Sequence, residues 1–410
     1  MKNAIYAQSG GVTAVINATA AGVIQTAKQY PNQINKIFAA KNGILGVLNN
    51  QLFDCANFTS TDLNKLYFTP GGAFGSCRYK LKDDAEFEKI VAIFKEHNIG
   101  YFFYNGGGDS QDTSLKISER SAQLGWPVQC IGIPKTIDND LPFTDNCPGY
   151  GSVAKYVAIS TLEAALDVAS MAESSTKVFV LEVMGRHTGW IAAAAGLIST
   201  TPLAAPHIIL FPERPFEEQK FIAKVAETVA TCGFCVIVTS EGVKHANGQF
   251  LNAQSSTDAF GHAQLGGVAA YLSNLVQTKL GLKNHYAIAD YLQRSARHIA
   301  SQVDVEQACA LGKHAVEIAI AGKQGVMPII VRTSNTPYQW HITDVNLNTV
   351  ANIEKHMPDD YIRADGFGIS EACRQYILPL IQGEAYPVYH NGLPDYLHTL
   401  GLNFSGKVPC

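Results

Sequence analysis

Short apolar runs rich in β-branched and aromatic residues alternate along this chain with longer stretches whose apolar residues recur at helical spacing. Strands separated by helices require crossover connections, so the alternation predicts an α/β fold with mainly parallel sheets. The predicted strands are 3–8, 36–40, 101–109, 127–134, 177–185, 207–213 and 234–242.

The division into domains has no compositional marker, because the sequence contains no low-complexity linker, internal repeat or block of like charge. Any boundary must therefore follow the topology of the sheets. We place a hinge near 148–151, before a second sheet, and expect the chain to return to the first sheet after 291–298. The predicted parts are a large domain of 1–149 plus about 294–330, a smaller domain of 150–293, and a C-terminal extension of about 331–410 packed on the core.

The composition narrows the class of protein. A chain of 410 residues with 47% hydrophobic content can bury a large core. Its formal net charge of -4, with 16% charged residues, provides no broad basic surface for nucleic acid. The first residues lack the pattern of a signal peptide, and no apolar run approaches membrane-spanning length. We therefore expect a cytoplasmic protein that binds anions only at local sites.

The nine cysteines have no framework spacing, which is typical of free thiols in a reducing compartment. Cys232 and Cys235 form a C-x-x-C sequence, but a helical stretch precedes it and a strand begins inside it. A thioredoxin-like site has the opposite order, so we interpret these residues as two buried thiols. The sequence contains no H-E-x-x-H and no second C-x-x-C, which argues against a zinc site made by protein ligands alone.

Glycine-rich turns follow two of the predicted strands. Ser9, Gly10 and Gly11 precede an Ala/Val-rich helical stretch, an arrangement that can seat a phosphate at a positive helix end or simply form a tight turn. The glycines 106–108 repeat the arrangement, with Asp109 and Ser110 as candidate N-caps. Neither turn matches the dinucleotide or P-loop fingerprint.

A third turn, "GIPKTIDNDLPF" at 132–143, combines a lysine and two aspartates. The three turns all follow parallel strands, so they are expected to converge on one cleft. If this segment is extended, Asp138 and Asp140 project to the same side. One carboxylate could then accept a hydroxyl proton while the other helps to hold Mg²⁺, as phosphoryl transfer requires. The alternative is an Asx-rich turn that caps a helix.

The sequences "SGG", "GGAFGSCR", "GGGDS", "PKTIDND", "VMGRHTGW", "TSEG" and "YLQRS" occur in the order and approximate spacing of the phosphofructokinase family, which residues 1 to about 300 resemble. The resemblance implies two three-layer α/β/α domains with mainly parallel sheets and an active site in the cleft between them. The large domain would bind the phosphoryl donor, and the smaller one fructose 6-phosphate. It also implies an oligomer with shared active sites, for which a homodimer is our expectation and a homotetramer the alternative.

The resemblance further implies the roles of individual residues. Asp138 would be the base for the 1-hydroxyl of fructose 6-phosphate, and Arg78 would contact the transferring phosphoryl group. The implied catalytic residues are Asp138, Lys135, Arg78 and Thr136. The implied donor-binding residues are Gly10, Gly11, Gly107, Gly108, Asp109, Ser110 and Lys135. The implied ligands of Mg²⁺ are Asp109 and Asp140.

The sugar phosphate would be bound mainly by the second group of motifs. The implied residues are Thr136, Asp138, Lys177, Met184, Gly185, Arg186, Glu241, Tyr291 and Arg294. Arg294 would grip the 6-phosphate, and Lys177 would reach the site of a neighbouring subunit. Taken singly, Arg186 and Arg294 could equally be surface charges and Glu241 a helix cap.

Two positions indicate pyrophosphate as the donor. Asp109 stands where ATP-dependent members have a glycine beside the α-phosphate, and Lys135 stands where they usually have another glycine. A carboxylate there would repel an α-phosphate, whereas a lysine suits pyrophosphate or phosphate. Two departures from the family pattern are Gly108, in place of the usual metal-binding aspartate, and His285, in place of an arginine, with Lys283 nearby.

Exchange of one phosphate linkage for another implies a reversible reaction. Three alternatives stay open at this point. They are an ATP-dependent phosphofructokinase, a non-catalytic sugar-phosphate sensor and a nicotinamide-dependent oxidoreductase. Only Gly108 favours the sensor, and the glycine fingerprint of the oxidoreductase is missing. Other phosphorylated sugars, such as sedoheptulose 7-phosphate, could bind as acceptors at the same site as the 6-phosphate of fructose 6-phosphate.

Overall fold

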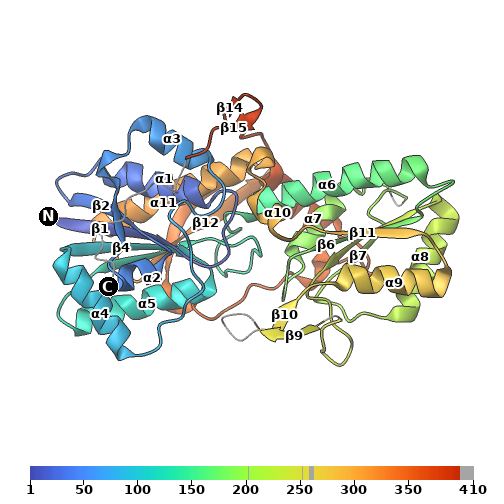
Figure 1. Cartoon of the computed structure of the whole chain (residues 1–410), viewed down its shortest axis with the longest axis horizontal. Helices are drawn as coiled ribbons and strands as arrows, with labels where there is room; N and C mark the ends of the chain where they lie inside the picture. The colour runs from blue at the N-terminus through green and yellow to red at the C-terminus, as the bar shows by residue number, and fades with distance from the viewer. Residues whose placement is uncertain (202, 252, 258–262, 398–410) are drawn as a thin grey trace. The chain divides into compact units, whose positions relative to one another are not determined.

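The computed structural model describes the chain except residues 202, 252, 258–262 and 398–410. Its internal contacts divide the protein into two units, each built around its own sheet (Figure 1). The first unit comprises 1–149, 295–355 and the chain from 383, and the second comprises 150–294 and 356–382. The sequence suggested residues 331–410 as an extension; the described part of it, 331–397, is shared between the two units, and 398–410 lie outside the described residues.

The first unit contains a seven-stranded sheet in the order β13-β12-β5-β4-β1-β2-β3. The inner neighbours run parallel, and only the edge strands β3 and β13 pair antiparallel. The strands are β1 (Lys2–Gln8), β2 (Ile34–Ala40), β3 (Leu52–Asp54), β4 (Ile99–Gly106), β5 (Gln129–Pro134), β12 (Val326–Asn335) and β13 (Tyr338–Asn346). A separate short pair consists of β14 (Tyr389–His390) and β15 (Leu393–Pro394).

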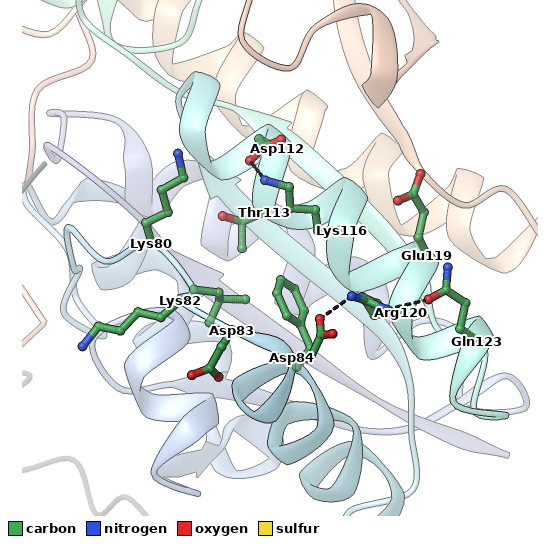
Figure 2. Close-up of a pocket in the computed structure, with 12 residues that line it drawn as sticks. Lys80, Lys82, Asp83, Asp84, Asp112, Thr113, Lys116, Glu119, Arg120 and Gln123 are labelled. Carbon is green, nitrogen blue, oxygen red and sulfur yellow. Dashed lines mark hydrogen bonds and ion pairs between the residues drawn. The ribbon is translucent and has the colours of Figure 1, made fainter.

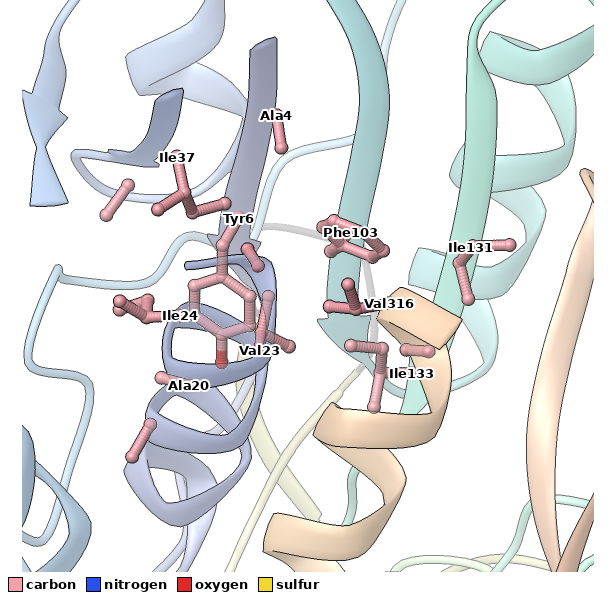
Figure 3. Close-up of a cluster of buried hydrophobic side chains, with 14 of the residues drawn as sticks. Ala4, Tyr6, Ala20, Val23, Ile24, Ile37, Phe103, Ile131, Ile133 and Val316 are labelled. Carbon is pink, nitrogen blue, oxygen red and sulfur yellow. The ribbon is translucent and has the colours of Figure 1, made fainter. Parts of the chain in front are cut away.

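Helices cover both faces of this sheet, which makes three layers. Alternate strand residues face opposite layers, so Ala4 and Tyr6 pack against α1 and α11, while Ile5 and Ala7 pack against α2, α4 and α5. Figure 3 shows the first of these cores, with α1 and α11 side by side over the strands. The helices are α1 (Ile16–Ala27), α2 (Ile44–Leu48), α3 (Ser60–Phe68), α4 (Asp84–Glu96), α5 (Gly108–Gln123) and α11 (Gln302–Ile320), with 3₁₀ turns at Cys55–Asn57, Arg297–Ile299 and Leu347–Thr349.

The second unit has a four-stranded sheet in the order β11-β6-β8-β7, and all of its pairs are parallel. Helices α8 and α9 pack on one face, and α6 and α7 lie on the other (Figure 1). The strands are β6 (Val178–Val183), β7 (Ile208–Leu210), β8 (Cys235–Ser240) and β11 (Asn284–Ile288), with a hairpin of β9 (Ala253–Thr257) and β10 (Ala263–Leu265). The helices are α6 (Tyr150–Met171), α7 (Trp190–Ala195), α8 (Glu218–Cys232), α9 (Val268–Leu280), α10 (Asp290–Ser295) and α12 (Glu371–Ile377), with 3₁₀ turns at Gly196–Ile198, Asp359–Tyr361 and Leu378–Ile381. The expectation of three-layer units with mainly parallel sheets is confirmed.

The part of the second unit that comes from 356–382 packs through aromatic rings. The ring centroids of Tyr361 and Tyr376 lie 5.9 and 5.1 Å from that of Trp190 at the start of α7. Arg374 of α12 donates hydrogen bonds to the carbonyl oxygens of Gly196 and Ser199. This late segment is therefore an integral part of the second core.

None of the helices in the described part of the chain is long and apolar enough to cross a membrane. The cysteines within the described residues are free thiols. The C-x-x-C sequence runs from the last residue of α8 to the first residue of β8, the helix-then-strand order that the pattern predicted. Cys235 is buried, but Cys232 is partly exposed, so the expectation of two buried thiols was wrong for Cys232.

Candidate functional site

The glycine turn after β1 and the lysine after β5 meet in the first unit. The buried Lys135 ammonium donates a hydrogen bond to the Gly11 carbonyl oxygen at 2.6 Å. Gly10 has a φ of +72°, and a Cβ atom there would lie 3.3 Å from Lys135 Nζ. A glycine at position 10 therefore permits both the left-handed backbone and the close approach of the cation.

The glycine turn after β4 joins the same region. The backbone N–H of Lys135 donates to the Gly106 carbonyl oxygen at 3.1 Å. Helix α5 begins at Gly108 with Gly107 as N-cap, and no side chain caps it. The expectation that Asp109 or Ser110 caps this helix was wrong, since both lie in its first turn. Asp109 is exposed and Ser110 is buried.

The turn after β1 is not a helix N-terminus. Helix α1 begins only at Ile16, and the Gly10 N–H donates to the Cys77 carbonyl oxygen at 2.9 Å. The predicted seat for a phosphate at the positive end of this helix was therefore wrong in its geometry. Instead, the turn binds the loop that carries the exposed Arg78, with the Ser76 hydroxyl donating to the Gly10 carbonyl oxygen at 2.7 Å.

A buried polar network lies beneath these turns, and the sequence reasoning missed it. The Gln8 side-chain amide donates to the Tyr6 hydroxyl at 3.2 Å and to Asn17 Oδ1 at 2.9 Å, and Asn105 Nδ2 donates to the same Tyr6 hydroxyl at 2.9 Å. The available signal was a polar residue near the end of each apolar strand, Gln8 in β1 and Asn105 in β4. The network fixes the strand ends from which the turns emerge.

The loop of residues 135–140 turns sharply after β5. Asn139 has a φ of +56°, so the segment is not extended and the geometric argument for Asp138 and Asp140 on one side was wrong. The Thr136 hydroxyl accepts the Asp138 N–H at 3.0 Å and lies 3.3 Å from Asp138 Oδ2. This local turn holds the Asp138 carboxylate in place next to Thr136.

Asp140 lies in a concentration of negative charge. Burial, and then the charges of Asp138 and Glu354, raise the pKa of the Asp140 carboxyl, although Lys355 acts in the opposite direction. A cation placed between the carboxylates would lower that pKa again. No cluster of three or more His, Cys, Asp or Glu side chains in the described ranges is arranged to hold a metal ion.

A cavity of about 420 Å³ lies along α5, on the helix that carries Asp109 (Figure 2). Four of the residues that line it form two ion pairs, one between Lys116 and Asp112 and one between Arg120 and Asp84. Its lining contains four basic and four acidic residues, so their charges balance. This cavity therefore lacks the excess of positive charge that would attract a polyphosphate.

The motifs of the second unit converge at the carboxyl ends of β6 and β8. The Glu241 N–H donates to the Val183 carbonyl oxygen at 2.9 Å. A Cβ atom on Gly242 would lie 2.0 Å from the Arg186 carbonyl oxygen, so only a glycine fits there. Gly185 has a φ of +132°, which also favours glycine. Met184, Gly185, Arg186 and Glu241 are thus neighbours.

The YLQRS motif, residues 291–295, contacts the same end of β6 through the neutral side chain of Gln293. The buried Gln293 accepts the Met184 N–H through Oε1 at 3.2 Å. The Arg294 guanidinium lies 4.2 Å from the ring centroid of the exposed Tyr291. Helix α10 therefore presents Tyr291 and Arg294 beside the turn that begins at Met184.

Glu182 is a buried carboxylate that the sequence reasoning overlooked. It accepts the backbone N–H groups of Gly267 at 3.0 Å and Ala269 at 2.8 Å, at the start of α9. Burial raises the pKa of Glu182 even though these donors lower it. Its carbonyl oxygen accepts the Ala289 N–H at 2.9 Å, which joins the end of β6 to the approach to α10.

Lys177 lies at the opposite end of β6 from Met184. Since a strand rises by about 3.3 Å per residue, the two residues are roughly 20 Å apart. The Lys177 ammonium donates to the carbonyl oxygens of Ala172 and Glu173 at the end of α6. His285 pairs with Phe179 near the same strand end. The fold thus does not bring Lys177 or His285 to the Met184 turn of their own chain.

A family model described as phosphofructokinase matches residues 3–319. The chain belongs to the phosphofructokinase family. It is 57% identical to a pyrophosphate–fructose 6-phosphate 1-phosphotransferase from Methylococcus capsulatus, over 99% of this chain and 98% of that protein. It is 55% identical to a protein of the same name from Halomonas elongata, with the same coverage. A crystal structure of a pyrophosphate-dependent phosphofructokinase from Marinobacter aquaeolei is 54% identical, with a TM-score of 0.92 and coverage of 100% of this chain and 99% of that chain.

The match to the phosphofructokinase model ends before β12 and β13. Glu354 and Lys355, whose charges act on Asp140, also lie beyond it. The charged surroundings of the loop 135–140 therefore come in part from residues outside the family-matched segment.

Proposed function

We propose that this protein transfers a phosphoryl group reversibly from pyrophosphate to the 1-hydroxyl of fructose 6-phosphate, giving fructose 1,6-bisphosphate and phosphate. The observation that carries the proposal is the similarity over almost the whole chain to proteins of that name, at 57% and 55% identity. The Lys135 ammonium beside the Gly10–Gly11 turn supports it, because it is a preformed cation for a small phosphate donor.

In the proposed reaction Asp138 is the general base. Its carboxylate accepts the proton of the 1-hydroxyl as that oxygen bonds to the phosphorus of the donor and the bridging P–O bond breaks. Thr136 holds Asp138 by the contacts described above. Lys135 balances charge on the departing phosphate, and Arg78 contacts the group in transfer. The other donor contacts are Gly10, Gly11, Gly107, Gly108, Asp109 and Ser110.

Mg²⁺ is the metal that suits these residues. Asp140 and Asp109 would supply carboxylate oxygens, and oxygens of the donor and water would complete the coordination. The negative charges of Asp138 and Glu354 near Asp140 would favour a cation at this place in the working enzyme. When bound, the ion would offset the negative charge of the donor phosphates.

The sugar phosphate is proposed to bind through the second unit. Met184, Gly185, Arg186 and Glu241 would contact the sugar, and Tyr291 and Arg294 the 6-phosphate end. The distance between Lys177 and Met184 along β6 supports a role for Lys177 in the site of a neighbouring subunit. Lys283 or His285 at the same strand end would assist it. This requires an oligomer, for which we propose a homodimer in the cytoplasm.

The choice of donor is tested by Asp109→Gly. We expect the unmodified protein with Mg²⁺ to phosphorylate fructose 6-phosphate with pyrophosphate at least about tenfold faster than with ATP. Removal of the Asp109 side chain should give measurable phosphorylation with ATP. The substitution removes a negative charge and a side chain from the position that the α-phosphate of ATP would occupy. The reverse reaction, formation of pyrophosphate from fructose 1,6-bisphosphate and phosphate, should be readily detected.

Two controls sharpen this test. Asp109→Asn removes the charge but keeps the size, which separates repulsion from steric exclusion. Glu371→Gly removes an exposed carboxylate from the first turn of α12 and should leave the donor preference unchanged. ATP preference in the unmodified protein would overturn the donor assignment, and binding of sugar phosphate without turnover would indicate a sensor.

A further inference from the structure

The loop between β5 and α6 needs support from elsewhere in the fold. It runs from Lys135 to Gly149 and contains Thr136, Asp138 and Asp140 without a regular helix or strand of its own. A loop of this length keeps one conformation only when its backbone groups are bonded to rigid elements. The contacts that hold it come largely from β12 and from the segment of residues 347–355.

Strand β12 holds the middle of the loop. The Asp145 N–H donates to the Ile330 carbonyl oxygen at 2.8 Å, and the Ile330 N–H donates to Thr144 Oγ1 at 3.1 Å. Arg332 makes a fork-shaped ion pair with Asp145, with nitrogen–oxygen distances of 2.9 and 3.0 Å. Only 13% of each of these two side chains is exposed, so the pair is well shielded from water.

Lys355 holds the same loop closer to Asp138 and Asp140. Its ammonium donates to the carbonyl oxygens of Asp145 at 2.9 Å and Thr144 at 3.2 Å, and it lies 3.4 Å from Asn139 Oδ1. Its backbone N–H donates to the Asp140 carbonyl oxygen at 2.6 Å. Lys355 therefore contacts the left-handed residue Asn139, the next residue Asp140, and the strand-bound part of the loop beyond them.

Asn139 explains why this cation matters. The backbone of Asn139, which lies between Asp138 and Asp140, is left-handed. Its side-chain oxygen also accepts the Cys147 N–H at 2.9 Å, so this hydrogen bond joins the beginning of the loop to its later part. The Lys355 ammonium donates hydrogen bonds to the Thr144 and Asp145 carbonyl oxygens, which this closure brings together. The segment 347–355 is itself anchored, since the Asn352 amide donates to Asp112 of α5 at 3.3 Å.

We propose that Lys355, which lies outside the family-matched segment, is a positioning residue that fixes the backbone of Asp138, Asn139 and Asp140 for phosphoryl transfer. This rests on the proposed function, in which Asp138 takes the proton. In this role Lys355 acts through the loop, whose backbone it holds and where its charge partly offsets that of Asp140. It gives the late part of the chain a specific task in the reaction.

The test is Lys355→Met, which keeps most of the length and removes the ammonium. A misplacement of about 1 Å at a catalytic group costs on the order of 100-fold in rate, so we expect kcat with pyrophosphate to fall by at least about tenfold. KM for fructose 6-phosphate should stay within about threefold, because the proposed sugar contacts are mainly in the second unit. Lys355→Arg should recover part of kcat, since a guanidinium can also donate to carbonyl oxygens.

Lys323→Met is the matched control. It removes a lysine that pairs with Asp344 of β13, in the same late part of the chain but away from the loop. Its kcat should equal that of the unmodified protein. The proposal is overturned if folded Lys355→Met keeps kcat within about twofold of the unmodified protein, or if its loss is matched by that of Lys323→Met.

Amide hydrogen exchange separates this proposal from the proposed function. Peptides spanning 138–147 should exchange at least about tenfold faster in Lys355→Met than in Lys323→Met, whether or not the protein turns over pyrophosphate. If Lys355→Met does not fold, the same comparison is made with Lys355→Arg, where a smaller increase confined to this loop is expected. Unchanged exchange in the loop would overturn the positioning role, whereas an inactive unmodified protein would overturn only the proposed function.

Discussion

The two groups of predicted site residues are built by different physical means. In the first unit, Lys135, Asp138 and Asp140 are charged groups whose positions depend on hydrogen bonds and on one another's charge. In the second unit, Gly185 and Gly242 permit backbone strands to approach closely, at distances that no side chain would allow.

The carboxylates of Asp140 in the first unit and Glu182 in the second show the same contrast. Asp140 faces further negative charge from Asp138 and Glu354. Glu182 instead meets the N–H groups of Gly267 and Ala269. The first region should therefore respond to changes of charge, cation and pH, and the second to changes of volume.

The largest effect is expected from Asp138→Asn, which removes the proposed base and keeps its shape. Loss of a general base costs about 100- to 10,000-fold, and kcat with pyrophosphate should fall within that range. KM for fructose 6-phosphate should change little in steady-state assays, since the amide still fills the site. A kcat within about tenfold of the unmodified protein would remove Asp138 from the role of base.

Gly242→Ala tests whether the second region depends on volume. The new Cβ atom would lie 2.0 Å from the Arg186 carbonyl oxygen, so the turn that carries Arg186 must move. We expect KM for fructose 6-phosphate to rise by at least about tenfold while KM for pyrophosphate stays nearly constant.

The control for this prediction is Gly233→Ala, at the end of α8. An added Cβ atom meets nothing within 4 Å there, although the φ of +83° makes the substitution mildly destabilising. Its kinetic constants should match those of the unmodified protein. Equal kinetic losses in both variants would mean that general destabilisation, and not the Arg186 turn, is being measured.

The smallest effect is a dependence of stability on charge at Asp140. Its pKa in the folded protein is raised above the unfolded value, so its contribution favours folding at low pH and is lost as pH rises through the raised pKa. In the absence of Mg²⁺ and substrates, Asp140→Asn should therefore unfold a few degrees above the unmodified protein at pH 8, since a change of about 1 kcal/mol shifts Tm by roughly 2 to 4 °C in a domain of this size. At pH 4 the two melting temperatures should converge.

Asp145→Asn provides the opposite case on the same loop. Its carboxylate pairs with Arg332 instead of facing like charge, so the substitution should lower the melting temperature at pH 8. If Asp140→Asn is less stable than the unmodified protein at pH 8, the first region is not governed by repulsion between carboxylates.

Much of the fold and the location of the motifs could be predicted. Parallel strands place their carboxyl ends at one edge, and in the first unit this brings Lys135 to Gly11 and to Gly106. The local geometry was predicted less well. The amino-acid sequence around Asn139 does not distinguish an extended segment from a left-handed turn, because asparagine adopts both conformations. The contacts of its side chain decide between them.

The sequence by itself determined the seven strands β1, β2 and β4–β8 and the order of the chemical groups along the chain, because periodicity and turn residues act over a few neighbouring positions. Only the tertiary structure decided that Lys355 supports the loop of Asp138, that Glu182 anchors α9, and that Lys177 lies far from Met184 along β6. These contacts join residues distant in sequence, and their energy depends on burial and on the direction of donors and acceptors. Neither quantity is specified until the layers of each unit have packed.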